Sequence, residues 1–369
     1  MYAEITNRSL ELSLRIISWN MGTGEADYLY SLINDHLKEN SGAAPWTEEA
    51  YNAAYDEIVP TLEKRYGEAE KVAAELLLKD DVRGHIYCLQ EGGKFNGRPL
   101  IEGLRAKGFQ FFHSQESKDT VVAVDPSRFQ VLSGNDLPMY DFKTNASIGL
   151  VRLKDRITGY EMMAASVWAP GFSFPKLELQ KKEPEGVPEG DCGAPYFGDQ
   201  HCFWVAQLLK QPQFPRMAFV GADMNASYIR PEQDEKNLNS NPGQWNRRYE
   251  YFTNEGFSVL QPPIDFATNV NPKPGEPEGT HERCIDTGLV RFPTLPIWKW
   301  VVHVAYNLFF EVFSNPQAKL REDINPLDGF DPAKNASDHR PLFFEIHFQR
   351  NPSWISRIFF RALAARTTW

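Results

Sequence analysis

Near its end the chain reads Ala336-Ser337-Asp338-His339-Arg340-Pro341, followed at once by Leu342-Phe343-Phe344-Glu345-Ile346-His347-Phe348. The second run is apolar and aromatic, which favours a β-strand. The turn before it places a hydroxyl, a carboxylate and an imidazole in sequence. The first two can cap nearby backbone, and the imidazole can titrate near neutral pH or donate to an anion. A solvated turn is the simpler interpretation, but four more polar clusters precede this one.

Each of these other clusters ends or interrupts an apolar run. They are Ser18-Trp19-Asn20, Leu89-Gln90-Glu91, Gly221-Ala222-Asp223-Met224-Asn225 and Ile285-Asp286-Thr287-Gly288-Leu289. A carboxylate inside an apolar strand is costly to bury unless it is paired or bound to a metal. Carboxylates that converge repel one another, and a hard divalent cation with oxygen ligands relieves that repulsion. This set of carboxylates, amides and a histidine indicates hydrolysis of a phosphoester.

Taken singly, each of these residues also has a structural interpretation. Asn20 could cap a turn, Glu91 could pair with Lys94, and Asp286 could pair with Arg283. The residues alone leave these alternatives open.

Composition bounds the class of protein. The chain has 369 residues, of which 42% are apolar and 24% charged, the balance of an ordinary folded protein with a sizeable core. Its net charge is −10, from 39 basic and 49 acidic side chains. No global positive field therefore recruits phosphates, which argues mildly against non-specific binding of nucleic acid.

Local patterns predict alternating strands and helices. Residues 48–79 are rich in helix formers, and Pro60 is expected to break them into two helices. Shorter helices are expected at 101–107 and 201–210, and a long Pro- and Gly-rich loop or lid at 174–199. Strands are expected at 12–20, 85–91, 109–112, 120–124, 129–132, 146–153, 160–168, 216–225 and 284–290.

The cysteines and the N-terminal residues indicate a compartment. No basic region followed by an apolar core precedes residue 14, so we expect no cleavable signal peptide. Cys88 and Cys284 lie in apolar runs and are expected to be buried thiols. Cys192 and Cys202 could form a disulfide, although thiols are favoured in a cytosol. The prediction is a cytoplasmic protein, or one exported by a signal-independent route.

The five clusters, in this order, resemble the endonuclease/exonuclease/phosphatase (DNase I-like) superfamily. The resemblance implies an α+β fold, a four-layer α/β/β/α sandwich with two mostly antiparallel sheets packed face to face. It also implies one catalytic domain over residues 1–350, with insertions near 40–80, 174–199 and 292–330.

The resemblance further implies a role for each polar residue. Glu91 would hold Mg²⁺, with Mn²⁺ as an alternative, Asn20 would support it, and Asp338 would lie near the metal. The catalytic residues would be Asp223, Asn225, Asp286 and His339.

Within this implied catalytic group, Asp223 would orient or deprotonate the attacking water, and Asn225 would steady the phosphate. Asp286 would hydrogen-bond His339 and keep its imidazole protonated against a phosphate oxygen. A carboxylate partner does raise a histidine's pKa, and a cation facing the phosphate stabilises the transition state.

One position departs from much of the superfamily. Many members carry a histidine where this chain has Trp168, within Val167-Trp168-Ala169-Pro170. AP endonucleases instead carry a tyrosine followed closely by proline, which this run resembles more. Trp168 is thus a candidate for binding substrate by stacking, and the alternative is an aromatic residue packed beneath the site.

Two segments outside the clusters are candidates for contact with a membrane. In 297–313, polar residues recur every four positions, which on a helix leaves a wide apolar face. That face could pack on the domain or lie in a bilayer surface, and four polar residues argue against a span. The segment 351–369 is basic and aromatic. Its part 352–366 predicts an amphipathic helix that closes the sandwich or binds a membrane or partner.

The sequence thus predicts a Mg²⁺-dependent hydrolase that cleaves a phosphodiester by in-line attack of a metal-site water. The run at Trp168 favours a nuclease-type substrate. One alternative is a membrane-associated lipid phosphoesterase that acts on a phosphoinositide or a sphingomyelin-like lipid. Another is a catalytically inactive binding module.

Overall fold

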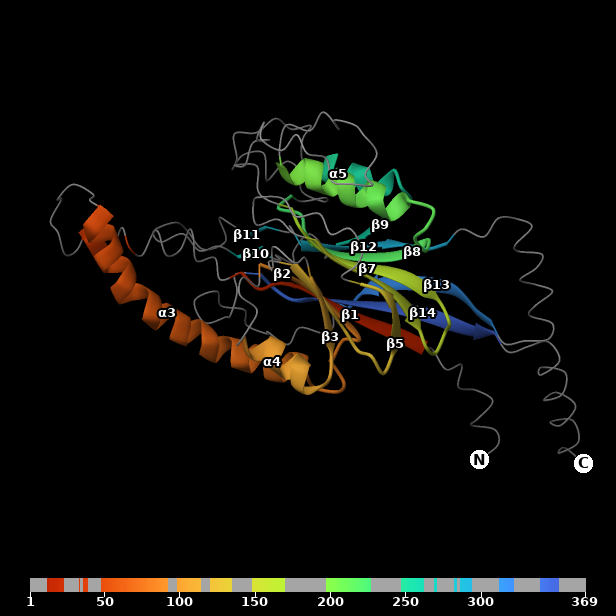
Figure 1. Cartoon of the computed structure of the whole chain (residues 1–369), viewed down its shortest axis with the longest axis horizontal. Helices are drawn as coiled ribbons and strands as arrows, with labels where there is room; N and C mark the ends of the chain where they lie inside the picture. The colour runs from red at the N-terminus through yellow and green to blue at the C-terminus, as the bar shows by residue number, and fades with distance from the viewer. Residues whose placement is uncertain are drawn as a thin grey trace, which may run out of the picture.

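Two six-stranded sheets lie face to face between layers of helix in the computed structural model of the chain (Figure 1). Helices α3 and α4 lie on the outer side of one sheet, and α5 lies on the outer side of the other. The expected α+β four-layer sandwich is therefore confirmed. The structure describes residues 12–22, 33, 36–38, 48–91, 98–113, 120–134, 148–169, 197–226, 247–261, 269–270, 282–283, 286–293, 312–321 and 339–351.

The first sheet, called sheet A, has the strand order β13-β14-β1-β2-β4-β3. Strand β1 runs antiparallel to β14 and parallel to β2, and the remaining pairs are antiparallel. Its strands are β1 (Leu12–Asn20), β2 (Ile86–Gln90), β3 (Gln110–His113), β4 (Thr120–Val124), β13 (Val312–Leu320) and β14 (Leu342–Asn351).

The second sheet, called sheet B, has the order β5-β6-β7-β8-β12-β9. Only β7 and β8 pair in parallel. Its strands are β5 (Phe129–Ser133), β6 (Ile148–Asp155), β7 (Glu161–Trp168), β8 (Met217–Asp223), β9 (Ser258–Leu260) and β12 (Asp286–Arg291). A separate two-stranded ribbon pairs β10 (Asn269–Val270) with β11 (Glu282–Arg283).

Apolar side chains fill all three spaces between the layers. Between the sheets, residues such as Ile16, Phe219 and Phe344 are almost fully buried. Burial of each such side chain stabilises the fold by about 1.5–3 kcal/mol. The outer side of sheet A is covered by α3 (Glu48–Leu77) and α4 (Pro99–Ala106). That of sheet B is covered by α5 (Phe197–Lys210) and α7 (Arg247–Thr253).

The sheets lie close together beneath the polar clusters. A Cβ atom added to Gly221 would lie 2.5 Å from Cys88 Cβ and 2.6 Å from Ser18 Oγ. Only glycine therefore fits at this point of β8. The close approach brings the strand ends of the two sheets within reach of one another. Cys88 is buried here, as expected.

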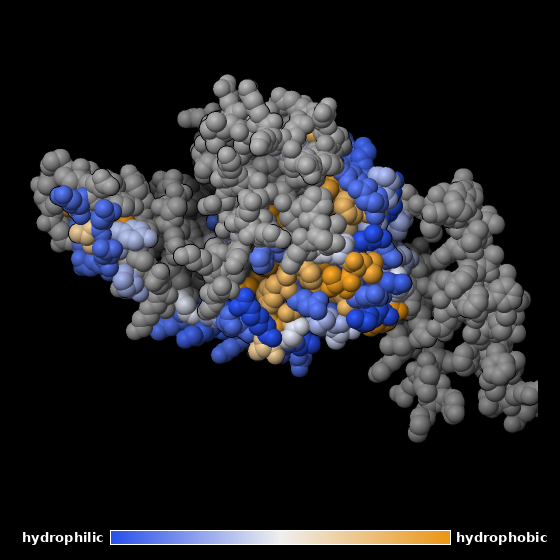
Figure 2. All heavy atoms as spheres, in the orientation of Figure 1, coloured by the Kyte–Doolittle hydropathy of each residue, from blue (hydrophilic) through white to orange (hydrophobic). Residues whose placement is uncertain are grey.

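The expected break at Pro60 is wrong, because α3 is one continuous helix with this proline inside it. Proline removes one backbone hydrogen bond, but the neighbouring turns can continue when packing holds them. Ala54 and Ala73, one on each side of the proline, are both buried. The outer side of α3 is mostly hydrophilic in Figure 2.

One other expectation on a segment is wrong, and a second segment contributes a strand. The predicted loop 174–199 ends earlier, because α5 begins at Phe197. The segment 292–330, expected to be an insertion, contributes edge strand β13 to sheet A. The apolar run 297–313, interpreted as helical, therefore ends within a strand. Pro316 lies at an irregularity of this edge strand, a place where a missing N–H is tolerated.

Several predictions lie outside the described residues. They concern Asp338, the helix expected over 352–366, Cys192, Cys284 and the part of 297–313 that precedes β13. Among the residues that the structure describes, no helix is long and apolar enough to cross a membrane.

Candidate active site

The polar residues gather at one end of the sandwich because of strand direction. The parallel pairs β1–β2 and β7–β8 bring Asn20 opposite Gln90, and Trp168 opposite Asp223. Strand β12 is antiparallel to β8, so its first residue, Asp286, pairs with Asp223. The start of β14 likewise lies beside the end of β1. Four strands thus end, and two begin, at the same place.

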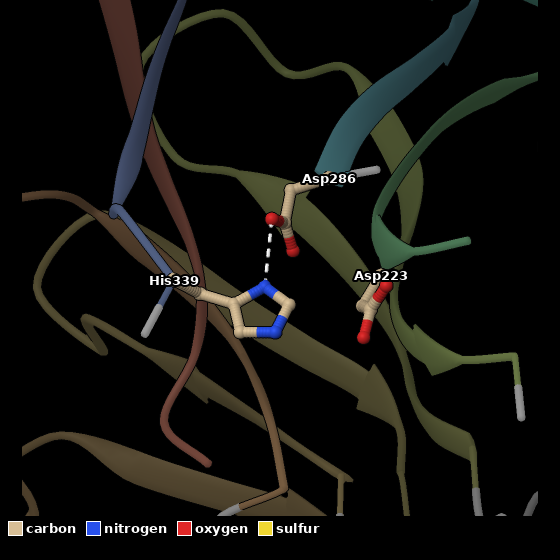
Figure 3. A group of neighbouring side chains, drawn as sticks. All are labelled: Asp223, Asp286 and His339. Atoms are coloured by element: carbon tan, nitrogen blue, oxygen red, sulfur yellow. Dashed lines mark hydrogen bonds and ion pairs between the residues drawn. The ribbon is translucent and has the colours of Figure 1, made fainter. Parts of the chain in front are cut away.

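Asp286 and His339 form the centre of this group (Figure 3). His339 Nδ1 lies 2.8 Å from Asp286 Oδ2, and both side chains are buried. An ionised carboxylate only accepts hydrogen bonds, so the proton of this bond is on Nδ1. The backbone of His339 is also fixed, because Trp19 Nε1 donates to its carbonyl at 3.0 Å. The second ring nitrogen is on the side of Asp223.

Asn20 joins the carboxylates of the two sheets. Its Nδ2 donates to Glu91 Oε1 and to Asp223 Oδ2, each at 2.8 Å. Its Oδ1 accepts the N–H of Gly22 at 2.7 Å, which is the turn cap that the sequence left open as an alternative. Asn20 therefore supports Glu91 and Asp223, and its side-chain oxygen is occupied by the turn.

Asn225 holds Asp223 from the other side. Its backbone N–H donates to Asp223 Oδ1 at 2.8 Å, and its Nδ2 donates to Asp223 Oδ2 at 3.1 Å. The same Nδ2 donates to the carbonyl of Ala169 at 3.0 Å. Both amide hydrogens are thus used inside the protein. Contact of Asn225 with a phosphate stays a prediction.

Two residues at this end have strained backbone. Glu91 has a φ of +48° and Asn225 a φ of +46°, in the left-handed region that residues other than glycine rarely adopt. Such strain costs about 1–3 kcal/mol per residue and clusters at functional sites. Each residue directly follows, or lies close after, a strand that carries a polar cluster. The strain therefore supports a functional role for this end of the sandwich.

Negative charge accumulates around Asp223. Burial raises the pKa of Asp223 to about 8, and the nearby carboxylates of Asp286 and Glu91 act in the same direction. His339 acts in the opposite direction. A proton or a bound cation would each relieve the repulsion among these carboxylates.

Asp223, Asp286 and His339 could hold a metal ion. They offer one ligand atom each, and these atoms lie within 4.8 Å of one another. Because Asp286 already accepts from His339, a hard cation would meet chiefly the carboxylate oxygens of Asp223 and Glu91. The donor set of carboxylates fits a divalent cation such as Mg²⁺ or Mn²⁺.

Trp168 is half-buried at the end of β7 and packs against the apolar cluster beneath α5. Its Nε1 is buried, and its backbone carbonyl lies 3.0 Å from His201 Nδ1. This position fits the packing alternative for much of the ring. A role in stacking on substrate stays a prediction.

Gln90 links the sheets directly behind the site. Its Nε2 lies 3.3 Å from Ser18 Oγ, 3.0 Å from Ser166 Oγ and 3.1 Å from the carbonyl of Gly221. Ser166 Oγ in turn donates to the carbonyl of Leu89 at 2.8 Å. Buried polar contacts of this kind fix the register between the sheets. The sequence placed Gln90 inside a cluster but gave it no role.

Two further residues were missed altogether. Asp199 and Arg248 form a fully buried ion pair on the outer side of sheet B, against the ends of β7 and β8. Asp199 lies in a polar segment, and Arg248 follows another arginine. Such residues are usually solvated, so no local pattern distinguishes them.

No family model matches this sequence, and no curated protein matches it. Its structure is similar to that of an endonuclease/exonuclease/phosphatase family protein from Bacteroides thetaiotaomicron. The identity is 12% and the TM-score 0.45, over 92% of this chain and 98% of that chain.

Two other solved structures are also similar. Truncated TDP2 from Caenorhabditis elegans has 11% identity and a TM-score of 0.44, over 91% of this chain and 98% of that chain. ANGEL2, a 2′,3′-cyclic phosphatase in complex with adenosine-2′,3′-vanadate, has 12% identity and a TM-score of 0.46. Its match covers 92% of this chain and 96% of that chain.

Proposed function

We propose that this chain is a metal-dependent phosphoesterase, a hydrolase that acts on a phosphoric ester. The observation that carries the proposal is the buried group of Asp223, Asp286 and His339 at the mouth of the sandwich. Glu91 is held beside this group by Asn20. A purely structural group would not place the two buried carboxylates of Asp223 and Asp286 beside the partly exposed carboxylate of Glu91, because each raises the cost of ionising the others.

Each side chain has a role that its contacts support. Asp223, held by three hydrogen bonds from Asn20 and Asn225, is fixed as an acceptor for a proton from the attacking water. His339 is oriented by Asp286, so its second nitrogen can donate to an oxygen of the phosphate. Glu91 and Asp223 would hold the cation. Bound Mg²⁺ would neutralise charge on the phosphate and lower the pKa of a water.

The finer proposal is Mg²⁺-dependent, in-line hydrolysis of a phosphodiester of the nuclease type. It is supported by Trp168, the last residue of β7, which pairs with Asp223 across the two strands and is only half-buried. An aromatic ring can stack on a base or a sugar next to the scissile phosphate. A divalent cation at the site would supply the positive charge that the acidic chain otherwise lacks.

A substrate panel tests both levels of the proposal. Product release with Mg²⁺ would be measured on abasic duplex DNA, plasmid, RNA, phosphoinositide vesicles and sphingomyelin vesicles, for the wild type and His339→Ala. Cleavage of a nucleic acid that His339→Ala loses is the expected result. Cleavage of vesicles alone would overturn the nuclease-type substrate but keep the phosphoesterase. Metal-independent turnover, or none on any substrate, would contradict the proposal as a whole.

A further inference from the structure

A buried ion pair lies directly behind the site, on the outer side of sheet B. Arg248 of α7 donates from Nε to Asp199 Oδ1 of α5 at 2.7 Å. Neither side chain has any exposed surface. Burial raises the pKa of Asp199, and the neighbouring Arg248 opposes that rise. The pair therefore joins the two helices that cover this side of the sheet.

The guanidinium of Arg248 also binds the ends of two strands. Its Nη1 donates to the carbonyls of Ala169 and Met224, the residues that directly follow β7 and β8. A planar guanidinium has five N–H donors in a fixed arrangement, so one side chain can fix several acceptors at once. Arg248 thus adds side-chain hydrogen bonds to two strand ends that the backbone already joins, because the N–H of Ala169 donates to the carbonyl of Asp223 at 2.9 Å.

The carbonyl of Ala169 connects this contact to the site. It accepts from Arg248 Nη1 at 3.3 Å and from Asn225 Nδ2 at 3.0 Å. The same Nδ2 donates to Asp223 Oδ2. A continuous set of hydrogen bonds therefore leads from Asp199 through Arg248 and the Ala169 carbonyl to Asn225 and Asp223.

Stability alone gives weak grounds for such a pair. Replacement of a buried ion pair by uncharged residues of similar volume is often neutral or stabilising, because both charges must be desolvated. Strain at Asn225, with its positive φ, persists only where surrounding contacts fix the backbone. The contacts of Arg248 and the bond from Tyr249 Oη to the carbonyl of Ala226, at 2.7 Å, fix it from both sides.

We propose that Arg248 is a positioning residue for the Asn225 amide and the Asp223 carboxylate, and that Asp199 orients Arg248. This inference rests on the proposed function, in which Asp223 accepts a proton. Neither Arg248 nor Asp199 touches the reacting atoms. Their loss displaces the acceptor and leaves the other contacts of the substrate in place. We therefore expect loss of either residue to lower kcat and to change KM by less than about threefold. A displacement of 1 Å can cost about 100-fold in rate.

The test variant is Arg248→Met with Asp199→Asn, which removes both charges and the bonds to the two carbonyls. Its matched control is Arg128→Met with Asp155→Asn. That buried pair joins β5 to the end of β6 that is remote from the site, with Arg128 Nη2 at 2.9 Å from Asp155 Oδ2. If the double variant does not fold, Arg248→Lys keeps the charge but lacks the planar donors.

Kinetics on bis(p-nitrophenyl) phosphate with Mg²⁺ gives the first measurement. We expect kcat to fall about 10- to 100-fold for the Arg248 variant and to stay within about twofold of the wild type for the Arg128 control. In an Asn225→Ala background the Arg248 substitution should cost little more, because both act through the same amide. The proposal would be overturned if the Arg248 substitution lowered kcat by the same factor with and without the Asn225 side chain. It would also be overturned if the Arg128 control lost as much kcat as the Arg248 variant.

A second measurement does not depend on turnover. The side-chain amide signal of Asn225, assigned by its absence in Asn225→Ala, would be followed by NMR in protein labelled at asparagine. It should shift in the Arg248 variant and stay in place in the Arg128 control. If the wild type hydrolyses no phosphoester, this shift still supports the positioning role while the proposed function fails. An unshifted signal overturns the positioning role, whatever the activity.

Discussion

Gly22→Ala should lower the catalytic rate without unfolding the protein. Gly22 lies two residues after the end of β1, and its backbone N–H donates to Asn20 Oδ1. A Cβ atom added at Gly22 would lie 2.7 Å from Glu91 Oε2, 2.9 Å from Asn20 Oδ1 and 3.2 Å from Glu91 Cβ. The first two distances are shorter than real Cβ contacts allow, so these side chains must move.

The size of the movement follows from these distances. To reach ordinary contact at 3.4 Å, Glu91 Oε2 must move by about 0.7 Å and Asn20 Oδ1 by about 0.5 Å. Both atoms are at the ends of side chains, so the fold can accommodate the change. The same atoms position the carboxylates of the site, and a displacement of 1 Å can cost about 100-fold. We therefore expect kcat to fall by about 10- to 100-fold.

The assay is hydrolysis of bis(p-nitrophenyl) phosphate with Mg²⁺, paired with thermal unfolding. Gly67→Ala is the matched control, because a Cβ at Gly67, inside α3, meets nothing within 4 Å. Alanine in a helix interior is favoured over glycine by about 1 kcal/mol, so this variant should keep its kcat and melt slightly higher. A Gly22→Ala protein with unchanged kcat would show that these displacements do not matter to the site, and one that fails to fold would show that the side chains cannot move as expected.

Three further perturbations have defined outcomes. Asp286→Asn removes the carboxylate that orients His339, and kcat should fall by about 100-fold or more in steady-state assays; an unchanged kcat would remove the pair from the mechanism. Burial lowers the pKa of His201 from 6.5 to about 4, so its contribution to stability is present above pH 6.5 and lost as the pH falls toward 4. In His201→Gln the slope of unfolding free energy against pH should therefore be shallower by about 1.4 kcal/mol per pH unit between these values, measured by urea titration; an unaltered slope would contradict the shift. The pKa of Asp223 is raised from 3.8 to about 8, so without metal its contribution to stability is present below pH 3.8, falls as the pH rises from 3.8 toward 8, and is absent above pH 8. At pH 9 in EDTA, Asp223→Asn should therefore have a higher melting temperature than the wild type. Added Mg²⁺ should raise the melting temperature of this variant by less than that of the wild type. A lower melting temperature for Asp223→Asn in EDTA would contradict a destabilising buried charge at Asp223.

The strands and the polar residues at their ends could be predicted from sequence because both are local. An apolar run that stops at a carboxylate or an amide is visible at Glu91 and Asp223. Strand β2 ends one residue before its expected end, and β8 ends two residues before its expected end. Burial of a polar residue needs a partner, so a site could be expected where such residues meet.

The partners themselves are set by register, which is not local. Asp286 could have paired with Arg283 by proximity in sequence, yet the antiparallel pairing of β12 with β8 places it opposite Asp223 and beside His339. Arg248 lies in a charged segment, and only the packing of α7 on α5 shows that it is buried. Pro60 was expected to end a helix. The helix continues through it because buried residues pack on both sides of the proline.

In the proposed function, this buried group hydrolyses a phosphoester with the help of a divalent cation. Its most direct test is turnover of bis(p-nitrophenyl) phosphate with Mg²⁺ and with EDTA, for the wild type, Glu91→Gln and a control, Glu161→Gln. Glu161 pairs with Arg152 at the opposite end of β7. We expect EDTA to abolish turnover, and we expect Glu91→Gln to lose most of its turnover while Glu161→Gln keeps it. Turnover that survives both EDTA and Glu91→Gln would contradict the proposed function.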